Sequence, residues 1–409
     1  MTLDTSNYKG VRDFYPEEMF IQDYITSVWH DVMQSFGYEH YSASILEAAE
    51  IYEGKTSDEI VSEQTYTFTD RGERRVTLRP EMTPSVTRMV AKKQRELAFP
   101  LRWYSIPNVF RYERPQKGRL REHWQLNADI FGIDSIEAEA ELIQISHQIM
   151  IKFGLTESDF VVRINDREIL ENVIKELGLN KENKKDFLKL LDKKDKVEDF
   201  NEKMEKLIGR PFDLVIEPNS KITKLTEKLN KRGITNIVYD PMLVRGFDYY
   251  TGIVFEVFDT NPENRRSVFG GGRYDTLMEL FGGQKVPTIG FGMGDVMIKE
   301  ILQSRGLLPK NVSGSHLYIA NINSESFDYS VNLANEIRKN GIDVVVDFSE
   351  KKIGDQIKTA DRKNIPLVLF VGPDEVKNES FKIKNIVSKD EVELDRDEII
   401  EFVKKSITG

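Results

Sequence analysis

Polar and apolar side chains alternate from residue 120 to residue 131, and this alternation constrains the fold more than any other feature of the sequence. Side chains of a β-strand point alternately to its two faces. One face therefore carries Arg121, His123, Gln125, Asn127 and Asp129, and the other carries Leu120, Trp124, Leu126, Ala128 and Ile130 beside Glu122. A buried polar stripe is costly unless it lines a polar cavity. The alternative, a sheet whose polar face lies in water, stays open at this point.

Residues 102 to 113 are predicted to form a strand that pairs with the first one. Arg111 and Glu113 then project from one face, close to the connecting loop. This loop, Arg114-Pro115-Gln116-Lys117-Gly118-Arg119, contains three cations and one proline. The two segments predict an antiparallel hairpin with a flexible, basic loop.

Composition limits the class of protein. The chain has 409 residues, with 58 Lys+Arg against 68 Asp+Glu and a net charge of −10. This charge excludes nucleic-acid binding over the whole surface, so such a partner must contact a local basic patch. The absence of cysteine excludes disulfides, thiol nucleophiles and Cys-ligated zinc. The first residues lack the apolar segment of a secretory signal, and no apolar stretch is long enough to span a bilayer, so we expect a cytoplasmic protein.

Changes in composition and hydrophobic pattern along the chain predict two domains. Apolar residues at helical spacing predict a helix over residues 16–36. Residues 167–232 are rich in Lys, Glu, Leu and Asn and predict a helical insertion with a solvated, mixed-charge face. The pattern breaks near residues 308–315, and strands then alternate with helices, which indicates an α/β domain. We therefore expect domains at 1–314 and 315–409.

Two glycine-rich segments, residues 270–272 and 290–294, fall outside the dinucleotide-binding pattern. The sequence also lacks the G-x-x-x-x-G-K-[ST] phosphate loop. If the protein handles ATP, side chains must hold the phosphates.

A second cluster of candidate residues lies at 245–252, Arg-Gly-Phe-Asp-Tyr-Tyr-Thr-Gly. An arginine and an aspartate beside two tyrosines, leading into the strand predicted at 252–258, are typical of a binding site. By pattern alone, Arg245 as a surface residue and the tyrosines as core residues remain an alternative.

Five motifs occur in the order found in histidyl-tRNA synthetases, and the whole chain resembles that family. They are residues 9–14, 78–83, 110–121, 245–252 and 270–274. The resemblance implies a class II synthetase catalytic domain, which is an α+β fold with an antiparallel sheet flanked by helices. It also implies the helical insertion, a C-terminal α/β anticodon-binding domain and a homodimer.

The resemblance also implies an activity and a set of site residues. Members of the family are ligases that join L-histidine to ATP as histidyl-adenylate and then transfer the histidyl group to the 3′ end of tRNA(His). Catalysis is expected from Arg111 and Arg245. Histidine binding is expected from Glu81, Thr83, Gln125, Asp129, Tyr249, Tyr250 and Tyr274. ATP binding is expected from Arg111, Glu113, Arg119 and His123, with Mg²⁺ brought by ATP and no metal site made by the protein alone. Arg114 and Gln116 are expected to contact the tRNA acceptor end.

Three positions depart from the family pattern. Ser44 stands where the first class II motif has proline, which bears on the dimer. Residues 292–297, Gly-Met-Gly-Asp-Val-Met, lack the arginine that ends the third motif, and Arg273 is a candidate replacement. Asp129 stands where many relatives have glutamate.

Two other members of the class II fold are alternatives. The regulatory subunit of ATP phosphoribosyltransferase usually lacks the anticodon-binding domain and degrades the Arg-Gly-Phe-Asp-Tyr-Tyr segment, and this chain keeps both. Synthetases for threonine, proline or glycine lack the two-tyrosine signature.

Overall fold

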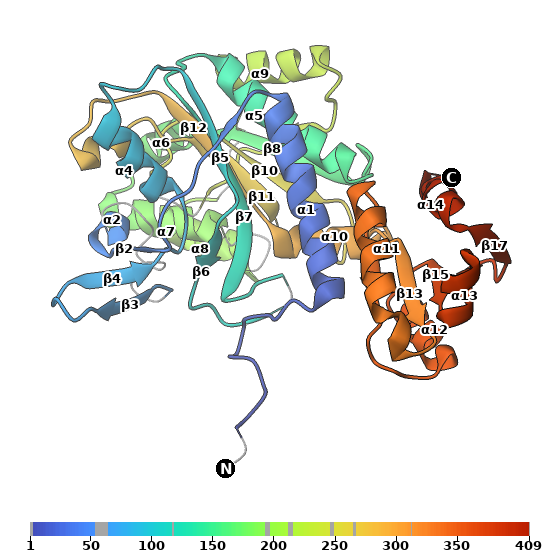
Figure 1. Ribbon diagram of the computed structural model, residues 1–409. Coiled ribbons are helices and arrows are strands. Elements are labelled where there is room, and N and C mark those ends of the chain that lie inside the picture. The colour runs from blue at the N-terminus through green and yellow to red at the C-terminus, as the bar shows by residue number, and fades with distance from the viewer. Residues whose placement is uncertain are drawn as a thin grey trace. The chain divides into compact units, whose positions relative to one another are not determined.

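The computed structural model describes residues 3–53, 64–116, 118–192, 197–211, 216–245, 249–264, 267–311 and 313–408. The chain divides into two compact units, Met1–Pro309 and Lys310–Gly409 (Figure 1). Each unit has its own sheet and hydrophobic core and is described by itself. No helix in the described ranges has both the length and the apolar character needed to cross a bilayer.

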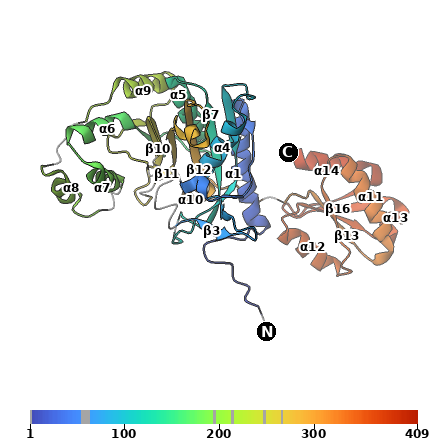
Figure 2. The same ribbon diagram turned by 90° about the vertical axis from the view of Figure 1, so that its left-hand side faces the viewer.

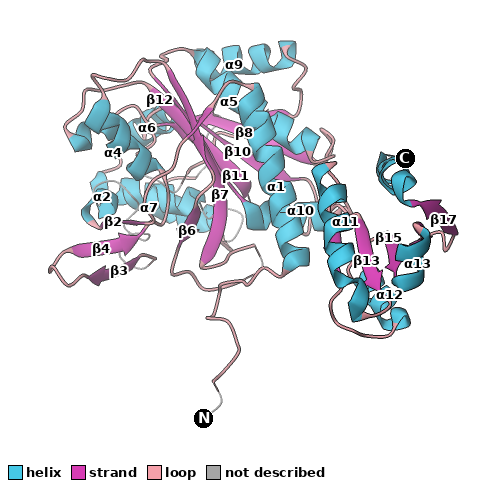
Figure 3. Ribbon diagram, in the orientation of Figure 1, coloured by secondary structure: helices cyan, strands magenta, loops and turns pink. Residues whose placement is uncertain are grey.

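A large, mostly antiparallel sheet forms the centre of the first unit (Figure 3). Its strand order is β1-β5-β7-β12-β11-β10-β8-β9, and β6 also pairs with β7. The strands are β1 (Glu39–His40), β5 (Leu101–Ser105), β6 (Asn108–Phe110), β7 (Glu122–Phe131), β8 (Phe160–Asp166), β9 (Ile237–Tyr239), β10 (Ile253–Asp259), β11 (Ser267–Arg273) and β12 (Thr288–Gly294). Pairing is parallel between β1 and β5 and between β8 and β9, and antiparallel at the other steps. Together with the flanking helices, this sheet confirms the predicted fold class.

Helix α1 (Pro16–Ser35) confirms the helix predicted over residues 16–36. Proline suits the first helical position because the amide there has no partner within the helix, and Gly37, with φ +75°, follows the helix end. The buried Trp29 donates from Nε1 to Met293 Sδ at 3.1 Å, which fastens α1 to β12. With α5 (Ile136–Lys152) and α10 (Asp295–Ser304), α1 covers the apolar face of the sheet.

The two faces of β7 differ as the sequence predicted. Leu126, Ala128 and Ile130 are buried in the main core beneath α1 and α5. On the opposite, polar face, His123, Gln125 and Asn127 line a cavity, and Asp129 is buried behind its lining. This arrangement excludes the alternative of a polar face in open water.

The strand predicted over residues 102–113 is interrupted. β5 ends at Ser105 and β6 begins at Asn108, and both pair with β7. Pro107 lies between them because it has no N–H for the ladder, although its carbonyl accepts from Gln125 N at 3.0 Å. β6 ends at Phe110, so the prediction that Arg111 and Glu113 project from one strand face is wrong: both follow the strand.

Helices occupy the region predicted as a helical insertion. They are α6 (Arg167–Glu176), α7 (Lys181–Asp192), α8 (Phe200–Ile208) and α9 (Ser220–Lys231). The first three lie on the side of the sheet away from α1 (Figure 2) and share a small core that includes Phe187 and Met204. Helix α9 instead packs on α5, and its buried Leu225 and Leu229 belong to the main core.

A small sheet of order β2-β4-β3 lies beside the large one. Its strands and neighbouring helices are β2 (Leu46–Ala48), α2 (Glu50–Glu53), β3 (Tyr66–Thr69), β4 (Arg75–Leu78), α4 (Thr83–Lys93) and the 3₁₀-helix η1 (Leu277–Phe281). The step from β4 through residues 79–82 into α4 confirms the strand, turn and helix predicted there.

The second unit is an α/β domain with the strand order β14-β13-β15-β16-β17. Its strands are β13 (Leu317–Asn321), β14 (Val344–Val346), β15 (Leu367–Val371), β16 (Ser380–Asn385) and β17 (Glu391–Asp395). Its helices are η2 (Ser324–Ser326), α11 (Phe327–Lys339), α12 (Ile353–Arg362), α13 (Pro373–Asn378), η3 (Arg396–Glu398) and α14 (Ile399–Thr408). β13, β14 and β15 are parallel, which confirms the predicted alternation, and β16 and β17 extend the sheet antiparallel.

Candidate active site

Glycines form the floor of the cavity on the polar face of β7. Gly292 of β12 pairs with Asn127, and Gly270 of β11 pairs with Gly292. A Cβ at Gly292 would lie 2.5 Å from Gln125 Nε2, and a Cβ at Gly270 would lie 2.5 Å from Arg245 Nη1. The glycine-rich segments are therefore central strands that leave room for site residues, a role that sequence reasoning missed.

The cavity has a volume of about 380 Å³. Most of the predicted site residues line it: Glu81, Thr83, Arg111, Glu113, Arg119, His123, Gln125, Arg245, Tyr249, Tyr250 and Tyr274. The other three lie elsewhere. Asp129 is buried behind the lining, and Arg114 and Gln116 are exposed on the loop that follows β6.

Arg111 enters the cavity from the segment between β6 and β7. Its Nε donates to Pro80 O at 2.8 Å, and its backbone N donates to Arg121 O at 2.9 Å. Arg121 is itself stacked 4.0 Å from the Tyr112 ring centroid. The guanidinium of Arg111 is thus held in place by the backbone through Nε, and its Nη atoms keep N–H donors for a ligand.

Arg245 lies on the opposite wall and is held by a carboxylate. Its Nη1 lies 2.5 Å from Glu256 Oε1, and both side chains are mostly buried, 14% and 15% exposed. Its Nε is buried without a hydrogen-bond partner. A buried, planar guanidinium with an unused donor suits an anion that presents two oxygens, such as carboxylate or phosphate. Sequence reasoning missed Glu256, although its place in a predicted strand that follows the Arg245 motif is a usable signal.

Glu81 and Tyr249 meet at the base of α4. Tyr249 Oη donates to Glu81 Oε2 at 2.9 Å, and Glu81 is almost fully buried. Burial and the Glu81 charge raise the pKa of Tyr249 well above its usual value, so its hydroxyl stays a donor. Thr83 begins α4 beside them.

Asp129 and Tyr274 form a buried hydrogen-bonded pair beneath the cavity. The Tyr274 hydroxyl donates to Asp129 Oδ1, and Asp129 Oδ2 has no hydrogen-bond partner. Burial raises the pKa of Asp129 to about 7, while the Tyr274 bond lowers it. Tyr250 lies beside Tyr249, with ring centroids 4.9 Å apart. The group offers acceptors and hydroxyl donors at one end of the cavity.

His123 lies at the other end of the cavity. Burial and the nearby charges of Arg111 and Arg12 lower the pKa of His123 to about 3, so the ring is neutral at physiological pH. Met297, from the start of α10, also lines this end, close to Gly118. A neutral ring and a thioether provide a surface for a flat, apolar group.

Glu113 and Arg119 face each other across the loop. Arg119 Nη1 lies 3.3 Å from Glu113 Oε2, and this oxygen is buried and accepts no hydrogen bond. In the part of the chain that the structure describes, no three His, Asp or Glu side chains group as metal ligands would.

In residues 292–297, where the arginine of the third motif is missing, Asp295 forms an ion pair with Arg12 of the N-terminal loop. Asp295 is fully buried, and its Oδ2 lies 2.7 Å from Arg12 Nη2. Asp295 Oδ1 accepts from Trp124 N at 3.0 Å. Arg12 of the N-terminal motif at residues 9–14, which the sequence left without a role, thus pairs with the residue of α10 that also binds the start of β7.

The idea that Arg273 replaces the missing arginine is wrong. Its Nε lies 2.6 Å from Glu139 Oε1 and its Nη1 lies 3.3 Å from Asp275 Oδ1, and the side chain does not line the cavity. Gly246, Phe247 and Asp248 of the Arg245 motif, and Lys117 of the basic loop, lie outside the described residues.

Comparison with known proteins places this chain in a family. The model of the histidyl-tRNA synthetase family matches residues 10–207 and 212–296, and that of an anticodon-binding domain matches residues 316–406. The histidine–tRNA ligase of Leptospira biflexa is 40% identical over 431 aligned positions, covering 99% of both chains. The apo histidyl-tRNA synthetase of S. aureus superposes with a TM-score of 0.74 at 25% identity, covering 98% of this chain and 100% of that one. The enzyme from Nostoc sp. PCC 7120 has the same fold, with a TM-score of 0.80 at 22% identity and coverage of 99% and 100%. The chain belongs to the histidyl-tRNA synthetase family.

Proposed function

We propose that this chain activates L-histidine with ATP and transfers the histidyl group to the 3′ end of tRNA(His). The observation that carries the proposal is that Arg111 and Arg245, from distant parts of the sequence, line one cavity whose floor is glycine. Family membership supplies the reaction class.

Adenylate formation needs a grip on the α-phosphate. The histidine carboxylate oxygen attacks the α-phosphorus, and pyrophosphate leaves with the electrons of the broken P–O bond. Arg111 would hold the α-phosphate, and Arg245 would lie between that phosphate and the carboxylate. Permanently charged guanidinium groups stabilise the added negative charge without a proton transfer, so positioning and charge provide the rate.

Histidine would bind at the Glu81 and Asp129 end of the cavity. Glu81, with Thr83 and Gln125, suits the α-ammonium group. Asp129, with Tyr249, Tyr250 and Tyr274 around it, suits the imidazole, since a neutral imidazole has one donor and one acceptor. A site built on such pairs rejects amino acids that lack them by about 10⁴-fold or more.

ATP would lie with its adenine at the His123 end, and Arg119 and Glu113 near its phosphates. Glu113 Oε2 accepts no hydrogen bond, and a carboxylate oxygen is the kind of ligand that Mg²⁺ prefers. Glu113 would therefore hold the Mg²⁺ that accompanies ATP, and the ion supplies charge neutralisation at the phosphates.

The tRNA would contact both units. Arg114 and Gln116 are exposed on the loop beside the cavity and would bind the acceptor end. The second unit, matched by the anticodon-binding model, would bind the anticodon. With a net charge of −10, these contacts depend on local basic groups.

We infer a cytoplasmic homodimer. Leu46 and Phe68 of the small sheet are 43% and 49% exposed, and Ile45, just before β2, is 42% exposed. Exposed apolar side chains grouped on one sheet are typical of an interface. Ser44, which replaces the family proline, accepts from Leu46 N at 3.2 Å through Oγ and so keeps the turn before β2. Sedimentation would show a dimer at micromolar concentration, and a monomer would contradict this inference.

The test of the activity is ATP–pyrophosphate exchange with each of the twenty amino acids, without tRNA. We expect exchange with histidine alone. Exchange with another amino acid, or none with histidine, would refute the proposal. A regulatory subunit of this fold would give no exchange.

The role of Gln116 is tested separately. Gln116→Ala should lower aminoacylation of tRNA(His) by about tenfold and leave pyrophosphate exchange unchanged, because the side chain lies outside the cavity. Equal loss in both steps would count against a tRNA contact.

A further inference from the structure

The cavity extends past Arg245 to a wall that the proposed histidine and ATP positions leave unused. This wall is formed by Arg163, Leu191, Asp240, Met242, Leu243, Val244 and Phe258. Arg163 of β8 pairs in register with Glu256 of β10, so the two side chains lie on the same face of the sheet. Arg163 is thus one strand, about 4.8 Å, beyond the carboxylate that holds Arg245.

Arg163 is fixed in place but is not a free cation. Its Nη1 lies 3.2 Å from Asp240 Oδ2, and its guanidinium carbon lies 4.4 Å from the Phe258 ring centroid. The side chain nevertheless remains 32% exposed. The charge of this guanidinium is balanced by Asp240, and its plane packs against the Phe258 ring. It is therefore suited to stacking with a flat group rather than to binding an anion.

The remaining walls agree with a flat, uncharged ligand. Met242, Leu243 and Val244 lead into Arg245, and Leu191 of α7 closes the far side. A phosphate group would have to displace Asp240 from Arg163, which costs a partly buried ion pair. A nucleobase would stack on the guanidinium and contact the apolar side chains.

The second step of the proposed reaction brings a nucleobase to this place. The ribose at the 3′ end of tRNA must reach the histidyl carboxyl group between Arg111 and Arg245. The terminal base is bonded directly to this ribose, so it must lie close to the same place. In the proposed function, histidine and the ATP adenine lie at opposite ends of the part of the cavity that β7 and β12 line. We propose, on the basis of the proposed function, that the β8 and β10 end of the cavity binds the 3′-terminal adenine of tRNA, stacked on Arg163.

The experiment compares both steps for Arg163→Ala and Arg163→Lys in the full chain. We expect pyrophosphate exchange within about twofold of wild type. We expect kcat/KM for aminoacylation to fall by about 10- to 100-fold for both variants, which is the usual effect of removing one stacking partner. Lysine keeps the positive charge but lacks the planar guanidinium, so Arg163→Lys should not restore aminoacylation. Arg232→Ala is the matched control, because Arg232 is 28% exposed and ion-paired with Glu137 outside the cavity.

The base itself is tested with tRNA that ends in cytidine in place of the terminal adenosine. The wild-type enzyme should prefer the adenosine end, and Arg163→Ala should lose that preference. Equal loss for both tRNAs, full rescue by lysine, or a parallel loss of pyrophosphate exchange would overturn the proposal. Failure of the proposed function itself would appear differently, as an absence of histidine-dependent exchange in the wild-type enzyme.

Discussion

The carboxylate of Glu256 lies against the guanidinium of Arg245, with 2.5 Å between Oε1 and Nη1. A carboxylate next to an arginine that is to bind anions lowers the local positive charge, so its value must lie in orientation. Gly270, the register partner of Glu256, leaves the space in which the two side chains meet. Glu256 is thus a positioning residue for Arg245.

Loss of the Glu256 carboxylate should lower kcat of pyrophosphate exchange more than it raises KM for ATP. For Glu256→Ala we expect kcat of pyrophosphate exchange to fall by about 10- to 100-fold, with KM for ATP within about threefold, because support of a ligand-binding group is usually worth that much. Glu256→Gln keeps a hydrogen-bond acceptor and should recover most of the loss. Glu141→Gln, which removes the carboxylate partner of Arg102 outside the cavity, is the control. A raised KM with unchanged kcat would contradict the positioning role.

Asp129 should make stability depend on pH. Burial raises the pKa of Asp129 to about 7 in the folded protein, against 3.8 for an ordinary aspartate. The folded state therefore binds the proton more tightly, and the free energy of unfolding falls as pH rises from about 4 to 7, by about 1.4 kcal/mol per pH unit. Asp129→Asn does not titrate. Relative to wild type, we expect it to gain about 4 kcal/mol between pH 4 and pH 8, measured by urea unfolding.

The same variant separates stability from function. Asp129→Asn removes the negative charge and replaces one acceptor oxygen with an N–H donor where the imidazole N–H is proposed to bind, so KM for histidine should rise by about 100-fold at pH 8. Asp23→Asn, an exposed carboxyl on α1, is the control for both measurements. A variant whose stability tracks wild type at every pH would show that Asp129 titrates normally.

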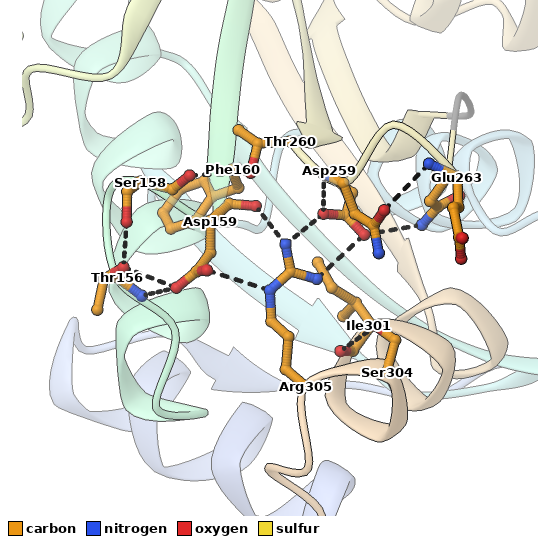
Figure 4. A network of polar contacts seen from close by, with 12 residues as sticks. Thr156, Ser158, Asp159, Phe160, Asp259, Thr260, Glu263, Ile301, Ser304 and Arg305 are labelled. Carbon is orange, nitrogen blue, oxygen red and sulfur yellow. Dashed lines mark hydrogen bonds and ion pairs between the residues drawn. The ribbon is translucent and has the colours of Figure 1, made fainter.

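Arg305 joins three segments of the first unit away from the cavity (Figure 4). Its Nε lies 3.1 Å from Asp159 Oδ1 and its Nη2 lies 2.5 Å from Asp259 Oδ1, and the Asp259 side chain is 1% exposed. Arg305→Ala leaves a buried carboxylate without its cation, so we expect a loss of about 3 kcal/mol in the free energy of unfolding. Arg232→Ala, at a surface pair, should cost less than about 1 kcal/mol. Pyrophosphate exchange by folded Arg305→Ala should equal that of wild type, and a loss of exchange would show that the network acts on the site.

Periodicity predicted the elements whose pattern is local. Helix α1, the two faces of β7 and the parallel strands of the second unit follow from spacing alone. The strand at residues 102–113 was predicted too long because Pro107 interrupts the ladder while the side-chain pattern continues. The pair β16 and β17 was not predicted, since residues 380–395 carry mostly polar side chains on a half-exposed edge.

The site was predicted less completely, for two physical reasons. The glycines of β11 and β12 are poor strand formers, and their use becomes visible only when Gln125 and Arg245 are seen to fill the space above them. The contact of Arg12 with Asp295 joins segments 283 residues apart, and a single sequence contains no signal for such a pair. Glu256 lies only 11 residues after Arg245, but its contact with Arg245 becomes visible only once the pairing of β10 with β11 is known. The resemblance identified candidate residues, and the fold shows which of them share a cavity.

Histidine-dependent pyrophosphate exchange by Arg245→Ala tests the central claim most directly, with circular dichroism and urea unfolding as checks of the fold. Removal of one charge-stabilising donor from a buried site typically costs about 100- to 1,000-fold in rate. We predict a loss of at least that size, matched by Arg111→Ala, in proteins that remain folded. Exchange at the wild-type rate in either variant would contradict the claim that the two arginines act together on one phosphate.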